Sequence, residues 1–374
     1  MPESLEFAYC GKTDVTPVVD ERLALAPAPN AAQQDILFDP ATYTAFPYVV
    51  RLDGDELLLS FRQAPRQAHI QHTHPRSVGT VMRSYDLGEH WDADNATQVG
   101  AGGGGGIAML YLGAGRVAGA LPKHSVAPRH EAARAGLPVH PHEYPFGLDG
   151  TYWVWSDSWG LLWPLANCTL VSHHAMSCAE PYRLADGEIL LPVYGKDGRL
   201  ATCSALLYRS TTERWDPSGG VVMALGAPDT REYYEPSIVE LAPGHLYALH
   251  RVGQVQVGAG NTFWANESFD GGLSWTEPVD TGIVSGACPR LLKLSDGRLL
   301  LTFGRREPPF GIRAMLSSDG KSWGDTAYIV REAPNGDQGY TSSIELGDGR
   351  VFTATYMQNA AGVTGIVGTF WTLP

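Results

Sequence analysis

Two short turn patterns that alternate along the chain predict an all-β fold, a six-bladed β-propeller of four-stranded antiparallel blades. One pattern is an Asp-Gly-type turn between two apolar runs, and the other is Ser-x-Asp-x-Gly-x-x-Trp. The composition agrees, since 43 Gly, 26 Pro, 16 Tyr and 10 Trp suit many short strands joined by tight turns with aromatic plugs. We therefore expect residues 1–374 to form a single propeller domain.

The first pattern marks the hairpin between the two central strands of each blade. An Asp-Gly pair between apolar segments is the strongest short hairpin signal, and the runs on both sides are apolar here, as central strands require. Complete or weakened copies occupy residues 52–54, 112–115, 184–187, 241–244, 294–297 and 346–349. Six copies at roughly blade-length intervals predict six blades.

The second pattern marks a turn farther out in the blade. Its Asp can accept hydrogen bonds from backbone N–H groups, its Gly supplies a positive φ, and its Trp packs the turn onto apolar surface. Good copies occupy 84–91, 268–275 and 317–323, and worn copies occupy 156–163 and 210–215. The sixth unit has no copy, so we expect the segment around residues 22–26 to supply its outer strand and close the ring.

The second unit carries an insertion at about residues 120–148. It is rich in Pro, His and Ala, and residues 130–135 permit a short helix. Long loops of a propeller gather on one face, which is usually the face that binds ligands. The insertion therefore indicates which end of the propeller holds the site.

The repeated Ser-to-Trp turn resembles the Asp-box, or BNR repeat, of the sialidase (neuraminidase) superfamily. The resemblance implies a glycoside hydrolase that acts on an acidic, carboxylate-bearing sugar, with its site where the inner strands begin. Glu235 and Arg251 match the family pattern in the fourth unit, and Tyr340 matches its nucleophile in the sixth. A phenol with a pKa near 10 is a poor nucleophile, so Glu235 would take its proton while Arg251 binds the substrate carboxylate.

Two of the family's clamp arginines have no counterpart in register. Ala45 stands where the first should be, and the third has only neighbouring candidates. Those candidates are Arg290, Arg305, Arg306 and Arg313. The predicted substrate-binding set is Arg251, Arg290, Arg305 and Arg62, the last of which lies on the strand after the first turn.

The acid/base aspartate of the family is also missing, and a histidine-rich stretch at residues 69–76 replaces it. A histidine can donate or accept a proton near neutral pH, so His72 or His74 is the predicted acid/base group. Local spacing completes no metal-ligand set among these histidines or those at 140, 142, 173 and 174. We expect neither a metal nor another cofactor.

Two other functions fit the same residues. A Tyr and a His across a pocket, with an Arg neutralising a carboxylate, could perform β-elimination at a uronic acid, which would make the protein a polysaccharide lyase. Asp-boxes carry no activity themselves, so a propeller that only binds sugars or proteins is the third possibility.

The net charge of −13 argues against nucleic acid and anionic membranes as partners, because both need a basic surface. A carbohydrate or another small anionic substrate needs only a local arginine cluster. The acidic start and the absence of a long apolar run predict a cytoplasmic protein. Five widely spaced Cys without a Cys-x-x-Cys pair are expected to be reduced.

Overall fold

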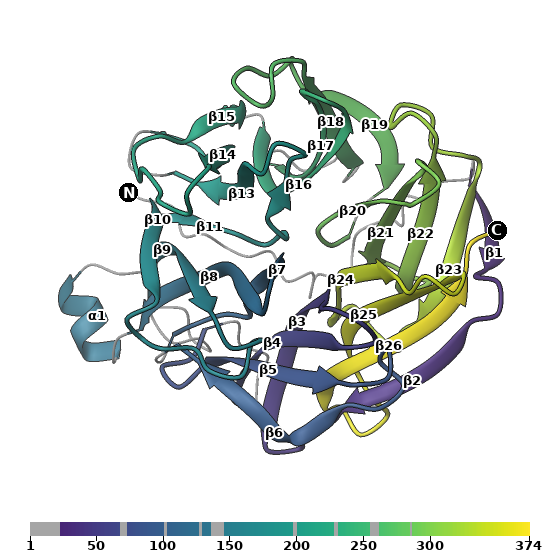
Figure 1. Ribbon diagram of the computed structural model, residues 1–374, viewed down its shortest axis with the longest axis horizontal. Coiled ribbons are helices and arrows are strands. Elements are labelled where there is room, and N and C mark those ends of the chain that lie inside the picture. The colour runs from purple at the N-terminus through teal and green to yellow at the C-terminus, as the bar shows by residue number, and fades with distance from the viewer. Residues whose placement is uncertain are drawn as a thin grey trace.

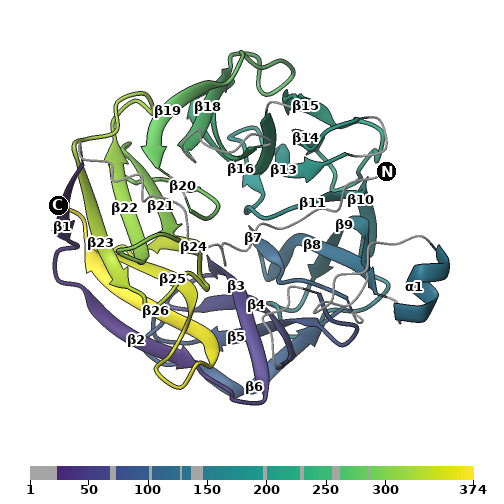
Figure 2. The same ribbon diagram turned by 180° about the vertical axis from the view of Figure 1, so that it is seen from behind.

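A computed structural model describes residues 23–67, 73–100, 103–126, 129–135, 146–196, 200–227, 231–254, 262–284 and 286–374. Six mainly antiparallel sheets surround a central axis (Figures 1 and 2), which confirms the predicted six-bladed all-β propeller. Within the part of the chain described, no helix is both long and apolar enough to cross a membrane.

The blades follow one another in chain order. Blade 1 contains β3 (Thr42–Arg51), β4 (Leu57–Pro65), β5 (Val78–Ser84) and β6 (Asp92–Val99). Blade 2 contains β7 (Ala108–Gly113), β8 (Arg116–Val126), β9 (Phe146–Ser156) and β10 (Cys168–His173). Blade 3 contains β11 (Ala175–Met176), β12 (Tyr182–Arg183), β13 (Ile189–Gly195), β14 (Ser204–Ser210) and β15 (Val221–Ala224).

The second half of the ring has the same plan. Blade 4 contains β16 (Arg231–Ala242), β17 (His245–Gln254), β18 (Thr262–Ser268) and β19 (Val279–Val284). Blade 5 contains β20 (Arg290–Lys293), β21 (Leu299–Arg305), β22 (Gly311–Ser317), β23 (Thr326–Glu332) and β1 (Ala24–Pro27). Blade 6 contains β24 (Gln338–Glu345), β25 (Arg350–Gln358), β26 (Thr364–Thr372) and β2 (Ala32–Leu37).

The six predicted hairpins join β12 to β13 in blade 3 and the first two strands in each of the other blades. Four are closed by the same backbone hydrogen bond, which the turn leucine donates to the residue four positions later. These bonds are Leu52 N to Glu56 O, Leu184 N to Glu188 O, Leu294 N to Arg298 O and Leu346 N to Arg350 O, all 2.8 or 2.9 Å long. The common geometry explains why the pattern could be read from the sequence.

The Ser-to-Trp turns lie between the third and fourth strands, as their local chemistry requires. In the copy after β18, the Asp270 carboxylate accepts hydrogen bonds from the backbone N–H groups of Leu273 and Ser274, at 3.0 and 2.9 Å. In the worn copy after β9, Ser158 Oγ takes that role and accepts from Leu162 N at 2.9 Å. These turns therefore order the ends of the outer strands, away from the inner strands of each blade.

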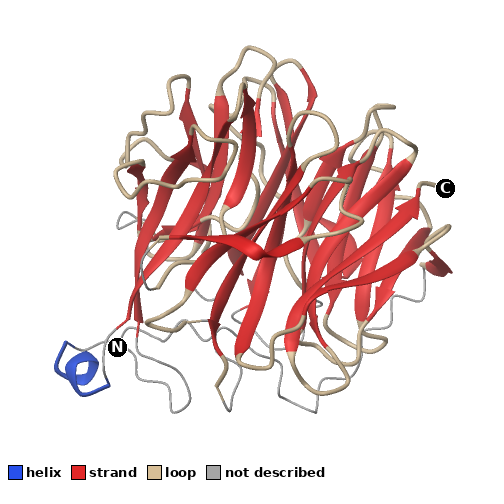
Figure 3. Cartoon of the chain, turned by 60° about the horizontal axis from the view of Figure 1, so that its bottom comes forward, coloured by secondary structure: helices blue, strands red, loops and turns tan. Residues whose placement is uncertain are grey.

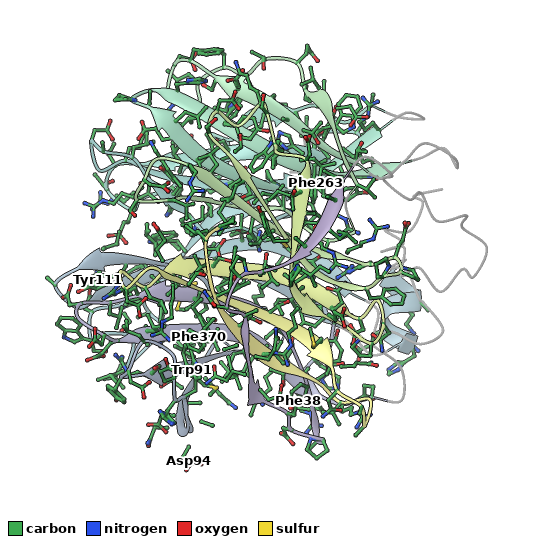
Figure 4. The ribbon with its side chains drawn as sticks, turned by 90° about the vertical axis from the view of Figure 1, so that its right-hand side faces the viewer. Phe38, Trp91, Asp94, Tyr111, Phe263 and Phe370 are labelled. Carbon is green, nitrogen blue, oxygen red and sulfur yellow. The ribbon has the colours of Figure 1, made fainter. Side chains whose placement is uncertain are left out.

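The core lies between neighbouring blades, so that each sheet is covered on both faces. Leu57, Leu58 and Leu59 on β4 are consecutive and all almost fully buried. Trp91 of blade 1 and Phe370 of blade 6 lie near each other at the junction of the two blades (Figure 4). Phe352 packs on both, with its ring centroid 5.9 Å from that of Trp91 and 5.0 Å from that of Phe370. Wedge-like packing of this kind holds the blades in register around the axis.

Closure of the ring differs from the sequence prediction. β2 pairs with β26 and supplies the outer strand of blade 6, whereas β1 adds to blade 5 in parallel with β23. The prediction that residues 22–26 close blade 6 is therefore wrong. The closing strand, Ala-Gln-Gln-Asp-Ile-Leu, is mostly polar because it lies at a sheet edge, so it carried no strand signal.

The insertion in blade 2 forms the helix α1 (Arg129–Ala135), as the sequence predicted. It lies outside the ring of sheets (Figure 3). Among the residues described, it is the only α-helix.

Candidate functional site

Three inner strands carry a bulge at the same axial end, and each bulge contains a residue with a positive φ. These residues are Phe46 on β3, Glu235 on β16 and Tyr340 on β24, with φ of 61°, 48° and 53°. The pairing register of all three strands shifts there. The left-handed conformation costs such residues roughly 1–2 kcal/mol, and strain of this kind is concentrated at functional sites.

The bulges occupy an equivalent position in the repeat. Counting six residues back from the leucine of each hairpin turn gives a ring of six positions around the axis: Phe46, Gly106, Cys178, Glu235, Cys288 and Tyr340. A Cβ on Gly106 would lie only 2.9 Å from Phe46 O, which confirms that blades 1 and 2 meet here. Burial raises the pKa of both ring thiols, and Glu235 adds to both shifts, so Cys178 and Cys288 lie neutral beside that carboxylate.

The centre of the site is a hydrogen-bonded chain of three side chains. Tyr340 Oη donates to Glu235 Oε1, and Arg251 Nη1 donates to Glu235 Oε2 at 3.1 Å. Glu235 is 1% exposed, whereas the Arg251 side chain is 26% exposed. The carboxylate is therefore sealed inside the protein, while part of the Arg251 side chain remains exposed.

Burial and charge around these three side chains keep the Tyr340 phenol protonated. Burial, and then the negative charge of Glu235, raise the pKa of Tyr340 well above its ordinary value, although Arg251 and Arg306 oppose the shift. Burial acts against the charge of Arg251, but Glu235 raises the pKa of its guanidinium overall. The resting site thus holds a neutral phenol that donates to an anion paired with a cation.

Arg306 rather than Arg305 borders the tyrosine. Its guanidinium lies 5.4 Å from the Tyr340 ring centroid, and its Nη2 donates to Tyr356 Oη at 2.9 Å. Phe46 packs edge-on against both rings, with centroids 4.8 Å from Tyr340 and 5.3 Å from Tyr356. Tyr340 is therefore bordered by the cation of Arg306 and by the aromatic rings of Phe46 and Tyr356.

The strained backbone around Tyr340 is held from several directions. Arg306 Nε donates to Gln338 O at 3.0 Å, Thr355 Oγ1 to Gly339 O at 2.8 Å, and Arg290 Nε to Thr341 O at 3.1 Å. Each carbonyl beside the bulge thus receives a side-chain donor. Together these hydrogen bonds hold the strained backbone conformation that directs the Tyr340 phenol toward Glu235.

Arg290, predicted to bind substrate, lies beneath the bulge with 3% exposure. Its Nε is 3.4 Å from Glu180 Oε2, and its guanidinium lies 5.4 Å from the Tyr48 ring centroid. Its Nη1 and Nη2 are buried without a hydrogen-bond acceptor among the residues described. The contacts of Arg290 are those of a support for the inner strands.

The other predicted site residues are placed less centrally. Arg305 is the last residue of β21 and lies near Arg313. Burial, and then the charge of Arg305, lower the pKa of Arg313 to about 10. Arg62 is buried on β4, with its guanidinium 5.9 Å from the Tyr43 ring centroid. Tyr43 Oη donates to Asp337 Oδ1 at 3.0 Å, and Asp337 lies three residues before Tyr340.

His74 lies on the loop after β4, close to Arg62. Its Nδ1 accepts a hydrogen bond from Arg76 N at 3.0 Å, and its Nε2 lies 3.3 Å from Gln67 Nε2. Burial, and then the charges of Arg62 and Arg76, lower the pKa of His74. The alternative acid/base candidate, His72, lies outside the described residues.

The residues that sequence reasoning did not select are Phe46, Tyr356 and Cys178, together with Arg306 as the preferred arginine. A count back from each turn leucine would have found two of them, because the repeat places Phe46 and Cys178 in the same ring as Glu235 and Tyr340. No three His, Cys, Asp or Glu side chains in the described part of the chain are grouped closely enough to hold a metal ion.

Comparison with known proteins agrees with this architecture. Residues 148–353 match the family described as the BNR repeat-like domain, and no curated protein matches. A protein of unknown function from Dyadobacter fermentans is similar in structure, with a TM-score of 0.77, 22% identity, and coverage of 92% of this chain and 100% of that one.

Two enzymes share the fold at lower identity. The intramolecular trans-sialidase from Ruminococcus gnavus has a TM-score of 0.61 and 14% identity, and the match covers 91% of this chain and 97% of the enzyme. The α-L-arabinanase from Penicillium chrysogenum has a TM-score of 0.60 and 13% identity, with coverage of 92% and 99%. At these identities the similarity shows the fold alone.

Proposed function

The chain belongs to the BNR repeat-like family, and on that premise we propose that it is a glycoside hydrolase acting on an acidic sugar. Tyr340 is the proposed nucleophile, Glu235 its base, and Arg251 with Arg306 the ligands of the substrate carboxylate. The observation that carries the proposal is the hydrogen bond from Tyr340 Oη to Glu235, with Arg251 on the second carboxylate oxygen.

This arrangement suits nucleophilic catalysis by a phenol. As Tyr340 Oη bonds to the anomeric carbon, its proton passes to Glu235 Oε1, with which it already shares a hydrogen bond. The bond between the anomeric carbon and the leaving oxygen breaks, and that oxygen takes a proton from the acid/base group. Water then gives one proton to the deprotonated acid/base group as its oxygen replaces the tyrosine on the anomeric carbon, and the proton on Glu235 returns to the phenol.

His74 or His72 is the proposed acid/base group. The lowered pKa of His74 means that the proton-donating form is populated only on the acidic side of the ordinary histidine range. Hydrolysis that depends on His74 is therefore expected to speed up as the pH falls through the lowered pKa of His74. An acidic optimum is the consequence.

The arginines near Tyr340 support an acidic substrate. The protein carries a net charge of −13, yet Arg306 borders the phenol, and Arg251, whose side chain is 26% exposed, binds the same carboxylate as the phenol. Arginine binds carboxylates through two parallel hydrogen bonds. Where the sialidase pattern has its first clamp arginine, this chain has the apolar pair Ala45 and Phe46, so we propose an acidic sugar that needs two arginines rather than three.

The test is turnover of a panel of aryl glycosides of uronic acids and sialic acid by the wild-type protein and by Tyr340→Phe and Glu235→Gln. Hydrolysis of an acidic glycoside, lost in both variants, is expected. The matched control is Tyr208→Phe, since Tyr208 is also buried but donates to Pro217 O in blade 3.

Three outcomes contradict the proposal. If both variants keep full turnover, the roles of Tyr340 and Glu235 are wrong. A product with a new conjugated double bond, detected by its ultraviolet absorbance, would identify a lyase. Binding of the panel without any product would identify a sugar-binding propeller.

A further inference from the structure

Next to the ring of six positions that contains Glu235 and Tyr340, the inner strands form a second ring with two opposite charges. Moving two residues along each inner strand gives its members: Tyr48, Ala108, Glu180, Ser237, Arg290 and Ser342. Residues two positions apart on a strand point to the same side, so the second ring lies one layer closer to the hairpin turns. Its only charged members are Glu180 from blade 3 and Arg290 from blade 5.

Glu180 and Arg290 contact the two residues that directly follow Tyr340. Glu180 Oε1 accepts a hydrogen bond from Ser342 Oγ at 2.6 Å, and Glu180 Oε2 lies 3.4 Å from Arg290 Nε. Arg290 Nε also donates to Thr341 O at 3.1 Å. Blades 3 and 5 are therefore both joined to blade 6 immediately after the phenol.

The two charges depend on each other because Arg290 is buried. It is 3% exposed, and among the described residues only Glu180 forms an ion pair with it. A buried cation that loses its counter-charge is costly, so the loss of Glu180 favours a shift of the guanidinium. Since Arg290 Nε bonds Thr341 O, such a shift is passed to the backbone beside Tyr340.

This backbone decides where the Tyr340 phenol points. Tyr340 has a φ of 53°, and a strained conformation of this kind persists only where its surroundings hold it. The register between β24 and β25 breaks between Gly339 and Ser342, so strand pairing does not fix the two residues in between. The contacts from the second ring act at the end of this gap.

We propose that Glu180 is a positioning residue, which acts through Ser342 and Arg290 to hold the Tyr340 phenol against Glu235. The inference rests on the proposed function, because it takes Tyr340 as the nucleophile. The placement of the phenol can nevertheless be tested without a substrate, since the Tyr340 hydroxyl bonds a buried carboxylate in the resting protein.

The first test is a double-mutant cycle between Glu180→Ala and Tyr340→Phe, measured by denaturant unfolding. If Glu180 holds the phenol in place, Tyr340→Phe removes less from a protein that already lacks Glu180. The loss in the folding equilibrium constant on Tyr340→Phe is expected to be about three- to tenfold smaller in the Glu180→Ala background. If Glu180→Ala does not fold, Glu180→Asp replaces it, because the shorter carboxylate keeps the charge but draws back from Ser342. Additive effects overturn the proposal.

Glu188→Ala is the matched control for the cycle. Glu188 is also a partly buried carboxylate of blade 3 that pairs with an arginine: its side chain is 14% exposed, and Oε1 accepts from Arg209 Nε at 3.1 Å. It lies at the hairpin turn, where its carbonyl accepts from Leu184 N. Its cycle with Tyr340→Phe should be additive, and a coupling as large as that of Glu180 would overturn the proposal.

The second test is steady-state kinetics on the aryl glycoside of the panel that the wild-type protein hydrolyses fastest. Glu180→Ala is expected to lower kcat about tenfold or more, because a misplaced nucleophile reacts slowly. KM should change by less than about twofold, since Arg251 and Arg306 are kept. A purely structural role would lower the thermal midpoint and leave kcat of the folded protein unchanged. An unchanged kcat, or a loss confined to KM, therefore overturns the proposal.

Failure of the positioning role and failure of the proposed function give different results. If the cycle shows coupling but the wild-type protein hydrolyses none of the panel, Glu180 positions Tyr340 and the hydrolase assignment is wrong. If the wild-type protein hydrolyses an acidic glycoside through Tyr340 but the cycle is additive, hydrolysis stands and the positioning role is wrong.

Discussion

Tyr340 on β24 and Glu235 on β16 are 105 positions apart in the chain, yet the phenol of one donates a hydrogen bond to the carboxylate of the other. The two belong to blades 6 and 4, and each occupies the bulge of its inner strand. The contact across the axis joins the proposed nucleophile to its proposed base, and the first prediction concerns it.

Replacing Tyr340 by Phe removes one hydroxyl from the centre of the site. Turnover is expected to fall at least about a thousandfold, because the nucleophile is lost. Glu235 also loses a donor while buried, which costs about 1–3 kcal/mol of unfolding free energy. Steady-state kinetics and denaturant unfolding measure the two effects, and Tyr208→Phe should leave turnover unchanged.

Replacing Arg251 by Met leaves the Glu235 carboxylate buried without its cation. Unfolding free energy is expected to fall by about 2–3 kcal/mol, since an unpaired buried charge is costly. Adding Glu235→Gln to this variant should recover part of the loss. The double-mutant cycle is measured by denaturant unfolding, and strictly additive effects would show that the pair is not coupled.

Arg306 and Arg305 provide a matched pair of neighbours. Arg306→Gln should raise KM for an acidic glycoside about tenfold or more, because its guanidinium lies beside Tyr340. Arg305→Gln should change KM for a single-unit glycoside by about twofold, through long-range charge alone. The same KM for both variants would contradict the placement of Arg306 as a carboxylate ligand.

Replacing Asp270 tests whether the Ser-to-Trp turns stabilise the fold without contributing to catalysis. Asp270→Ala removes the acceptor of the Leu273 and Ser274 N–H groups, so the thermal midpoint should fall by a few degrees. The kcat and KM should stay at their wild-type values, because the turn lies between outer strands. A loss of kcat with an unchanged thermal midpoint would contradict this prediction.

His250 predicts sensitivity of the fold to acid. Burial lowers the pKa of His250 to about 4 from the ordinary 6.5, and its Nε2 bonds Asn266 Oδ1 at 2.8 Å. Between pH 6.5 and 4 the unfolded chain binds a proton that the folded protein excludes, so stability falls as the pH falls. The gap of about 2.5 pKa units corresponds to about 3 kcal/mol at most.

The measurement is unfolding free energy at pH 7 and pH 4 for the wild-type protein and for His250→Gln. The variant should lose less stability on acidification. His130→Gln is the control, since the His130 side chain on α1 is 70% exposed. An identical acid loss in the His250→Gln and wild-type proteins would contradict the assignment.

Whether a feature of the site could be predicted depends on how far apart in the chain its residues lie. Glu235 and Arg251 lie on strands joined by one turn, so their pairing could be predicted from a short motif. Arg305 and Arg306 are adjacent, and only the direction of the strand decides which of them reaches Tyr340. No local pattern distinguishes two neighbours that point to opposite sides of a strand.

The sequence by itself determined the hairpins, the Asp-box turns and the number of blades, because each depends on hydrogen bonds within a few residues. The tertiary structure decided which edge strand closes blade 6, where β2 pairs with β26. It also decided which side chains meet at the axis, where Phe46, Glu235 and Tyr340 come from three blades. Both depend on the packing of blades around the ring, which no single segment encodes.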